Sequence, residues 1–290
     1  MKLSTFTVEQ ERPMPTGFFH KIFVILSLVT LVAACSSKPD KRKHQSQLYF
    51  GAGTQSLMSQ DYTDALSNLL KANELDPDNA GILTNLGMAY YFKGERDLAV
   101  KTLKKSIELD EDNSDAKINL ASIYFKDGDF DNSEKIYKSV LKHLTYDKQA
   151  RTLYNLGVIE LQRQRLSSAE NYFKKSIKEE SNYCPSYFQL GLIQYEKKQF
   201  NLALKNFREA SMGTCYESSP GAHYYQGLTL TSLKRFNEAR LKYDELDARF
   251  KSSDYAAKAR MKMMELNEIE KNNLTEESHA SRKLLESPEF

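Results

Sequence analysis

The chain has 290 residues, 28% of them charged, and a formal net charge of +2. This balance gives no compositional case for nucleic-acid binding, and the few glycines (12) and prolines (7) argue against a β-sandwich or barrel. The length suits one large domain or an elongated array.

The N-terminus carries the features of an export signal. His20 and Lys21 precede an apolar run over residues 22–34, which at about 13 residues is shorter than the roughly 20 that cross a bilayer as a helix. A charged start, a short apolar run and small residues at its end are typical of a cleaved signal peptide. Residues 1–34 are therefore predicted to be a signal peptide. The alternative to a cleaved signal peptide is an uncleaved N-terminal anchor. Translation is predicted to start at Met14, because the residues before it carry two glutamates.

Small residues stand directly before Cys35 in the stretch Val-Ala-Ala-Cys. This stretch resembles the lipobox of bacterial lipoproteins. The resemblance implies that the Cys35 thiol is acylated, that the chain is cut before Cys35, and that the acyl chains anchor it to a membrane. Ser36 favours the outer membrane of a Gram-negative bacterium, on its periplasmic face, by analogy with enteric-type sorting. Residues 35–45 are predicted to be the lipidated cysteine and a polar, basic tether.

One sequence pattern recurs along the rest of the chain. The stretch over residues 85–113 has near-copies over 154–182 and 188–210, spaced by about 34 residues. This resembles the tetratricopeptide repeat, in which two antiparallel helices form one unit. The resemblance implies an all-α, right-handed superhelical solenoid of six helix pairs, over residues 46–79, 80–113, 114–149, 150–183, 184–219 and 220–253. A capping helix over 254–270 and a mobile tail over 271–290 are predicted to follow.

The repeats share small and large residues at fixed spacing. A small residue in the first helix falls at Gly53, Gly87, Ala121, Gly157, Gly191 and Gly227. A small residue in the second helix falls at Ala65, Ala99, Ser133, Ala169, Ala203 and Ala239. A large residue stands four positions later at Leu69, Leu103, Tyr137, Phe173, Phe207 and Tyr243. Small residues let paired helices approach closely, and the large residue fills the contact between helices.

The first helix of each tetratricopeptide pair lines a concave groove. The groove positions here are predicted to be Phe50, Leu57, Met88, Tyr91, Ile118, Phe125, Tyr154, Val158, Leu161, Phe188, Leu192, Tyr195, Tyr224 and Leu228. Exposed apolar rows usually mark partner sites, so an amphipathic helix or extended apolar segment of a protein is the expected ligand. The alternative is that superhelical twist buries much of this row. Tetratricopeptide arrays that dock chaperones use Lys and Asn at the groove positions to hold a terminal carboxylate. This chain lacks that set of residues.

Two further cysteines are predicted to pair. Cys184 opens the first helix of the fifth repeat and Cys215 follows its second helix, so antiparallel packing places both at the same end. An exported chain meets an oxidising compartment, which favours a disulfide. The alternative is two unpaired small core residues.

No motif in the sequence predicts an enzyme, a cofactor, a metal site or a small-molecule substrate. The five histidines are scattered, and neither a phosphate-binding loop nor a nucleophile elbow is found. Residues 127–133 resemble the start of an EF-hand, but Asn132 and Lys138 stand where the loop needs Gly and Glu. This stretch is predicted to be a turn inside the third repeat. Asn79 and Asn113 are predicted to cap helices between repeats.

Taken together, the lipidated cysteine, tether, six repeats, final helix and late disulfide resemble the type IV pilus assembly lipoproteins called PilF, PilW or Tgl. These are pilotins, which bring secretin subunits to the outer membrane and support their assembly. The closing segment, residues 243–261, is similar to that of the family, with Phe250 and Lys251 in place of its Tyr-Pro. The resemblance implies secretin subunits as the partner. The alternatives are a periplasmic scaffold for peptidoglycan enzymes and an accessory of the barrel-assembly machinery.

Overall fold

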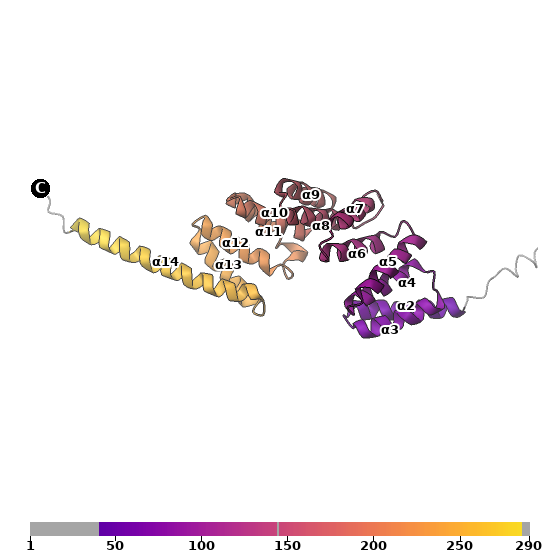
Figure 1. Cartoon of the computed structure of the whole chain (residues 1–290). Coiled ribbons are helices and arrows are strands. Elements are labelled where there is room, and N and C mark those ends of the chain that lie inside the picture. The colour runs from indigo at the N-terminus through magenta and orange to yellow at the C-terminus, as the bar shows by residue number, and fades with distance from the viewer. Residues whose placement is uncertain (1–40, 144, 286–290) are drawn as a thin grey trace, which may run out of the picture. The chain divides into compact units, whose positions relative to one another are not determined.

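The computed structural model describes residues 41–143 and 145–285 (Figure 1). These residues form thirteen α-helices, α2 to α14, and one short 3₁₀ helix, with no strand among them. The all-helical prediction is confirmed. The predicted signal peptide, Cys35 and the first part of the tether lie outside the described residues.

The helices follow one another in six pairs and end in a long single helix. The pairs are α2 (Lys41–Met58) with α3 (Tyr62–Leu75), α4 (Ala80–Phe92) with α5 (Arg96–Leu109), α6 (Ser114–Lys126) with α7 (Phe130–Val140), α8 (Gln149–Gln162) with α9 (Leu166–Glu179), α10 (Cys184–Glu196) with α11 (Phe200–Glu209), and α12 (Pro220–Ser232) with α13 (Phe236–Arg249). The last helix is α14 (Asp254–Leu285), and the 3₁₀ helix (Gly213–Cys215) lies between α11 and α12. The chain divides into two compact units, residues 1–96 and 97–290. No helix in the described part is long and apolar enough to span a bilayer.

Each pair is joined by a turn with one left-handed residue at the same position of the repeat. These residues, with φ between 57° and 85°, are Gln60, Gly94, Gly128, Gln164, Lys198 and Lys234. A left-handed residue ends the first helix and lets the chain reverse direction. Only two of the six are glycine, so the other four turns hold an L-residue in a conformation that costs about 1 kcal/mol or more.

The predicted helix caps are confirmed. The Asn79 side chain accepts a hydrogen bond from the backbone N–H of Ile82, and Asn113 accepts one from Ala116. Asp129 caps α7 in the same way, directly after Gly128. The acidic stretch that resembled an EF-hand is therefore the turn between α6 and α7, as predicted.

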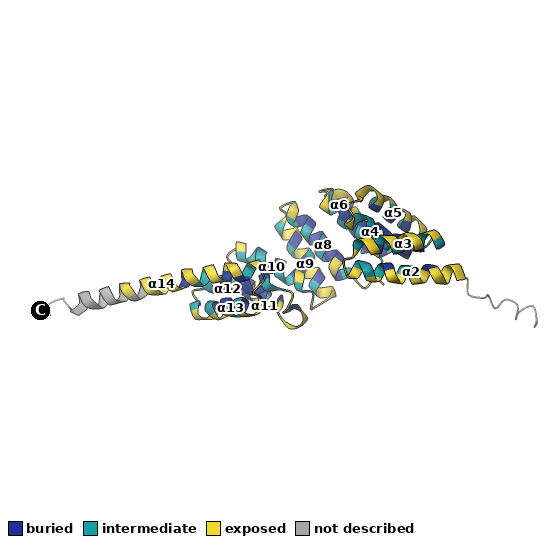
Figure 2. Cartoon of the chain, turned by 90° about the horizontal axis from the view of Figure 1, so that it is seen from below, coloured by how far each residue is buried: buried dark blue, intermediate teal, exposed yellow. Residues whose placement is uncertain are grey.

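The paired small and large residues pack as their spacing predicts. A Cβ atom added to Gly157 would lie 2.6 Å from the ring of Phe173, and one added to Gly191 would lie 2.5 Å from the ring of Phe207. The two rings are completely buried. These two repeats thus each build a small core of their own, and Figure 2 shows buried residues spread along the helices of both units.

Two predicted boundaries are wrong. Helix α2 begins at Lys41, so residues 41–45 are helical although they were assigned to the tether, and the buried hydroxyl of Ser46 donates to the carbonyl of Ala72 on α3. Helix α14 continues to Leu285, past its predicted end at residue 270 and through much of the predicted tail. The reason is local: no glycine or proline occurs between residue 254 and Pro288, so nothing in the sequence stops the helix.

Candidate partner-binding site

The fourteen predicted groove residues lie on the first helices of the pairs, but none of them is fully exposed. Twelve are half-buried, whereas Ile118 is 2% exposed and Tyr224 is 9% exposed. Ile118 packs in a cluster with Tyr137 and Leu156, and Tyr224 packs in one with Tyr243. The prediction that these two residues line an accessible groove is therefore wrong, because neighbouring helices cover them.

In the first unit, the groove residues lie close to its small core. Phe50 and Leu57 pack against the buried cluster of α3 and α4 that includes Leu69 and Leu86. The ring of Tyr91 meets that of Phe92 edge to face at 5.6 Å. These side chains offer a partner part of their apolar surface only, since the rest is in contact with the core.

In the second unit, an aromatic cluster links the last two repeats. We call it the Tyr225 cluster; its members are Phe188, Tyr195, Phe200, Phe207 and Tyr225, from α10, α11 and α12. The ring of Tyr225 lies 5.4 Å from that of Phe207, 5.8 Å from Phe188 and 6.1 Å from Tyr195. Phe200 completes the cluster at 5.4 Å from Tyr195. Only Phe207 is fully buried, so four rings keep part of their surface accessible.

Two members of this cluster are predicted groove residues, and two others are not. Phe188 and Tyr195 were predicted to line the groove, whereas Tyr225 and Phe200 were not. Tyr225 stands one position after the predicted groove position at Tyr224. The pair of adjacent tyrosines, Tyr224 and Tyr225, is the sequence signal for this position. Adjacent residues of a helix point in different directions, so Tyr224 is buried while Tyr225 is half-buried.

Two tyrosines on or beside this face, Tyr225 and Tyr183, are held in the neutral form by burial. Burial raises the pKa of Tyr225, and it raises the pKa of Tyr183, which lies 5.8 Å from the ring of Tyr154, to about 12. The hydroxyl of Tyr195 lies 3.3 Å from that of Ser232. This surface combines apolar rings with neutral hydroxyl groups, which suits binding of an apolar peptide segment.

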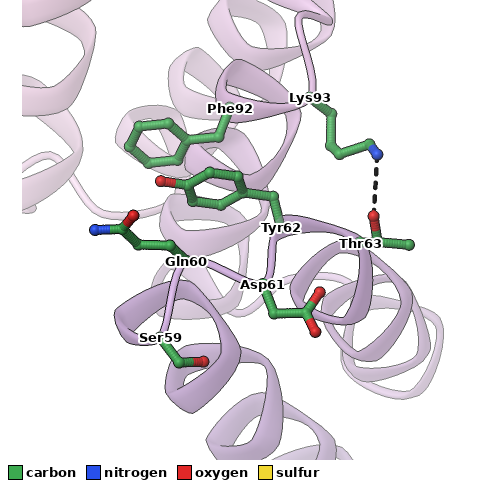
Figure 3. Close-up of a pocket in the computed structure, with 7 residues that line it drawn as sticks. All are labelled: Ser59, Gln60, Asp61, Tyr62, Thr63, Phe92 and Lys93. Carbon is green, nitrogen blue, oxygen red and sulfur yellow. Dashed lines mark hydrogen bonds between the residues drawn. The ribbon is translucent and has the colours of Figure 1, made fainter.

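A surface hollow of about 540 Å³ lies at the turn between α2 and α3 (Figure 3). The rings of Tyr62 and Phe92 stack at 4.5 Å along it, and Lys93 Nζ donates to Thr63 Oγ1 at 3.1 Å. Its one carboxylate, Asp61, accepts a hydrogen bond from the backbone of Asp64 as a helix cap. The Asp61 carboxylate is thereby engaged in capping α3. No cluster of metal-ligating side chains occurs among the described residues.

The two late cysteines are joined as a disulfide in the structure. Cys184 opens α10, Cys215 lies in the 3₁₀ helix after α11, and their Cα atoms are 6.1 Å apart. This separation lies inside the range that disulfides span. The bond ties the loop before α12 to the start of α10.

A buried histidine lies next to this loop. His223 is 1% exposed, and neither ring nitrogen has a hydrogen-bond partner in the described part of the chain. Its ring packs against Tyr216 at 4.7 Å and Phe250 at 5.3 Å. Burial lowers the pKa of His223, because this environment disfavours the charged ring.

The stability of the protein is expected to fall as the pH drops from 7 to 5, in part because of His223. The unfolded His223 titrates near its usual pKa of about 6.5, while the folded residue resists protonation. The unfolded chain therefore binds more protons below this pH, which favours unfolding. His223→Leu should reduce the difference between the unfolding free energies measured in urea at pH 7 and pH 5. His44→Leu, at an exposed position, is the control, and equal pH dependence in wild type and His223→Leu would contradict the assignment.

Family models for the tetratricopeptide repeat match residues 58–94, 80–113 and 113–178. The chain therefore contains tetratricopeptide repeats. Among curated proteins, neutrophil cytosol factor 2 of Mus musculus is 33% identical over 64 residues, and that of Bos taurus is 33% identical over 79 residues. The aligned stretches cover 22% and 27% of this chain, but only 12% and 15% of those proteins.

Two solved structures of pilus proteins share the fold over nearly their whole length. PilF of Pseudomonas aeruginosa matches with a TM-score of 0.65 and 17% identity, over 76% of this chain and 99% of that chain. PilW, a widely conserved type IV pilus biogenesis factor, matches with a TM-score of 0.62 and 16% identity, over 73% and 97% of the two chains. Cut9 in its complex with Hcn1 matches with a TM-score of 0.61, over 83% of this chain but 45% of its own. At these identities, the similarity shows a shared fold.

Proposed function

We propose that the protein is a lipoprotein of the outer membrane that binds a protein partner through its tetratricopeptide repeats, and that it acts as a pilotin for the type IV pilus secretin. The observation that supports this most is the similarity in fold to PilF and PilW over nearly the full length of both. The larger protein Cut9 shares the fold over less than half of its length, which makes it a weaker guide.

The anchor in this proposal is the acylated Cys35. Several acyl chains on one cysteine hold a protein far more firmly than a single chain does. Lipoprotein sorting would then carry the protein and its bound secretin subunit to the outer membrane. Confinement there raises the effective concentration of subunits for assembly.

The partner surface in this proposal is the half-buried face of α8, α10 and α12, with the Tyr225 cluster at its centre. Its rings and neutral hydroxyls would cover an apolar segment of the secretin subunit until assembly. Aromatic residues are the side chains that most often dominate the binding energy of such interfaces.

The proposal is tested by a secretin immunoblot of unboiled membranes from a deletion strain and a Cys35→Ala strain. Deletion is expected to abolish the high-mass secretin multimer and leave monomer in the inner membrane. If the Cys35→Ala strain still forms multimers but in the wrong membrane, the acyl anchor is needed for localisation and not for partner binding. Normal outer-membrane multimers in the deletion strain would refute the pilotin role and favour a scaffold for peptidoglycan enzymes or an accessory of the barrel-assembly machinery.

The partner surface is tested by Leu192→Lys. Leu192 is half-buried on α10, so a lysine there would place a charge against the apolar segment of a partner. We expect at least about tenfold less secretin multimer, as for the loss of an interface anchor. Leu202→Lys is the matched control, because Leu202 is 51% exposed on α11 of the same repeat. An equal loss of multimer in both variants, each folded by circular dichroism, would move the partner surface away from α10.

A further inference from the structure

Helix α14 stands where the first helix of a seventh repeat would begin. It packs on α12 and α13 through a buried side that includes Ala259 and Leu266. In each of the six repeats a turn and a second helix follow the first helix, but α14 continues as one helix to Leu285 (Figure 1). No second helix in the described part of the chain therefore covers the outer side of α14.

The outer side of α14 carries two exposed methionines. Met261 and Met264 are 64% and 68% exposed. They stand one repeat length after Gly227 and Leu230 of the sixth repeat. There the same positions are covered, because Gly227 lies against the Tyr243 ring of α13 and Leu230 is only 2% exposed. The two methionines thus occupy positions that a second helix covers in the preceding repeat.

These methionines belong to a stripe of exposed residues on one side of the helix. Residues spaced by four, three and four positions share a helix face. We call them the outer stripe of α14; its members are Ala257, Met261, Met264 and Glu268. Methionine is flexible and adapts its shape to an opposing surface, so the centre of the stripe suits contact with another helix.

The charges around the outer stripe complement a second copy of the same stripe. Consider two copies that run antiparallel, with Met261 of one opposite Met264 of the other. Lys258 then falls beside Glu265 and Glu268 of the second copy, and the two-fold symmetry repeats this contact. A parallel alignment would instead place each of these charges next to its own copy. Within the described residues neither Lys258 nor Glu268 forms an ion pair, so both charges are available to a second copy.

We propose that two copies of this chain pair through the outer stripes of their α14 helices in this antiparallel alignment. The methionines supply the apolar contact, and the pairing of Lys258 with the glutamates sets the direction. One helix face per copy is smaller than the standard interface of about 800 Å² per partner, so a dimer of micromolar affinity is expected. This interaction goes beyond the proposed pilotin role and does not depend on the lipid anchor.

Analytical ultracentrifugation tests whether the dimer forms. The protein is the chain from residue 35 with Cys35→Ser, which keeps all described residues. Its sedimentation coefficient should rise with concentration from that of a monomer to that of a dimer. Combining Met261→Lys with Met264→Lys should weaken the dimer at least about tenfold, as for the loss of interface anchors. Leu241→Lys is the matched control and should change it little, because Leu241 is also 68% exposed but lies on α13.

Cysteine cross-linking tests the antiparallel alignment. The variants Ala257→Cys and Glu268→Cys each add one thiol, and in the proposed dimer these two positions lie opposite each other. Mixing the two variants under mild oxidation should therefore give a disulfide-linked dimer. Neither variant should cross-link alone, because equivalent positions would lie about 16 Å apart along the helices, too far for a disulfide.

Four results would overturn the inference. A chain that stays monomeric at every concentration would exclude the dimer, and equal weakening by Leu241→Lys would exclude a specific role for α14. Efficient cross-linking of either cysteine variant alone would indicate a parallel pair. A monomeric chain whose two methionine substitutions abolish the secretin multimer in cells would assign the outer stripe to a helix of the secretin instead. The ultracentrifuge assay contains no secretin, so its failure leaves the immunoblot test of the pilotin role unaffected.

Discussion

Replacing Phe207 with alanine is expected to lower the free energy of unfolding by about 3–5 kcal/mol. The side chain is completely buried, its ring covers Gly191, and it contacts the rings of Phe188 and Tyr225. Its removal leaves a cavity between α10, α11 and α12 that the remaining rings fill only in part. Urea denaturation followed by circular dichroism measures the loss.

The contact between Phe207 and Gly191 is measured by a double-mutant cycle. Gly191→Ala alone should destabilise the protein by about 1–3 kcal/mol, because the new methyl group would lie 2.5 Å from a ring that cannot move away. In the Phe207→Ala background this clash is absent, and alanine is the better helix former by about 1 kcal/mol. The effect of Gly191→Ala on the free energy of unfolding should therefore change sign between the two backgrounds.

Gly51→Ala on α2 is the control for this cycle. A Cβ atom at Gly51 meets nothing within 4 Å, so the substitution should stabilise the protein by about 0.5–1 kcal/mol through helix propensity alone. Similar effects of Gly51→Ala and Gly191→Ala would refute the close-packing explanation for the repeated glycine.

The sequence predicted the helix pairs well, because their packing depends on residues inside one repeat. The spacing from Gly191 to Phe207 reports a contact between two helices joined by a single turn, and the same holds for Gly157 and Phe173. The turn conformation was harder to predict. Gln164 and Lys198 adopt the left-handed conformation without being glycine, so only their place in the repeat marks them.

The sequence predicted the accessible surface less well, because burial depends on neighbouring repeats. Ile118 and Tyr224 occupy the same repeat position as the half-buried Tyr154 and Phe188, yet the helices next to them cover them. Tyr225 joins its cluster through rings from three helices, a contact that no spacing within one repeat encodes.

Removing the disulfide is expected to destabilise the protein by about 3–4 kcal/mol in the chain-entropy model. The two cysteines are 31 residues apart in sequence, and the bond closes a loop that contains all of α10 and α11. Without it, the unfolded chain gains the freedom of that loop. Urea denaturation of wild type and of a variant combining Cys184→Ser with Cys215→Ser measures the difference.

Reduction with dithiothreitol separates this effect from the loss of sulfur packing. Reduced wild type should unfold at the lower urea concentration of the double variant, and the double variant itself should not respond to the reductant. Loss of the disulfide should also loosen the segment after Cys215, where Tyr216 packs on His223. Amide hydrogen exchange should therefore increase in this segment more than in α2 or α3. Unchanged stability of the wild type after complete reduction would mean that packing alone holds this loop against α10.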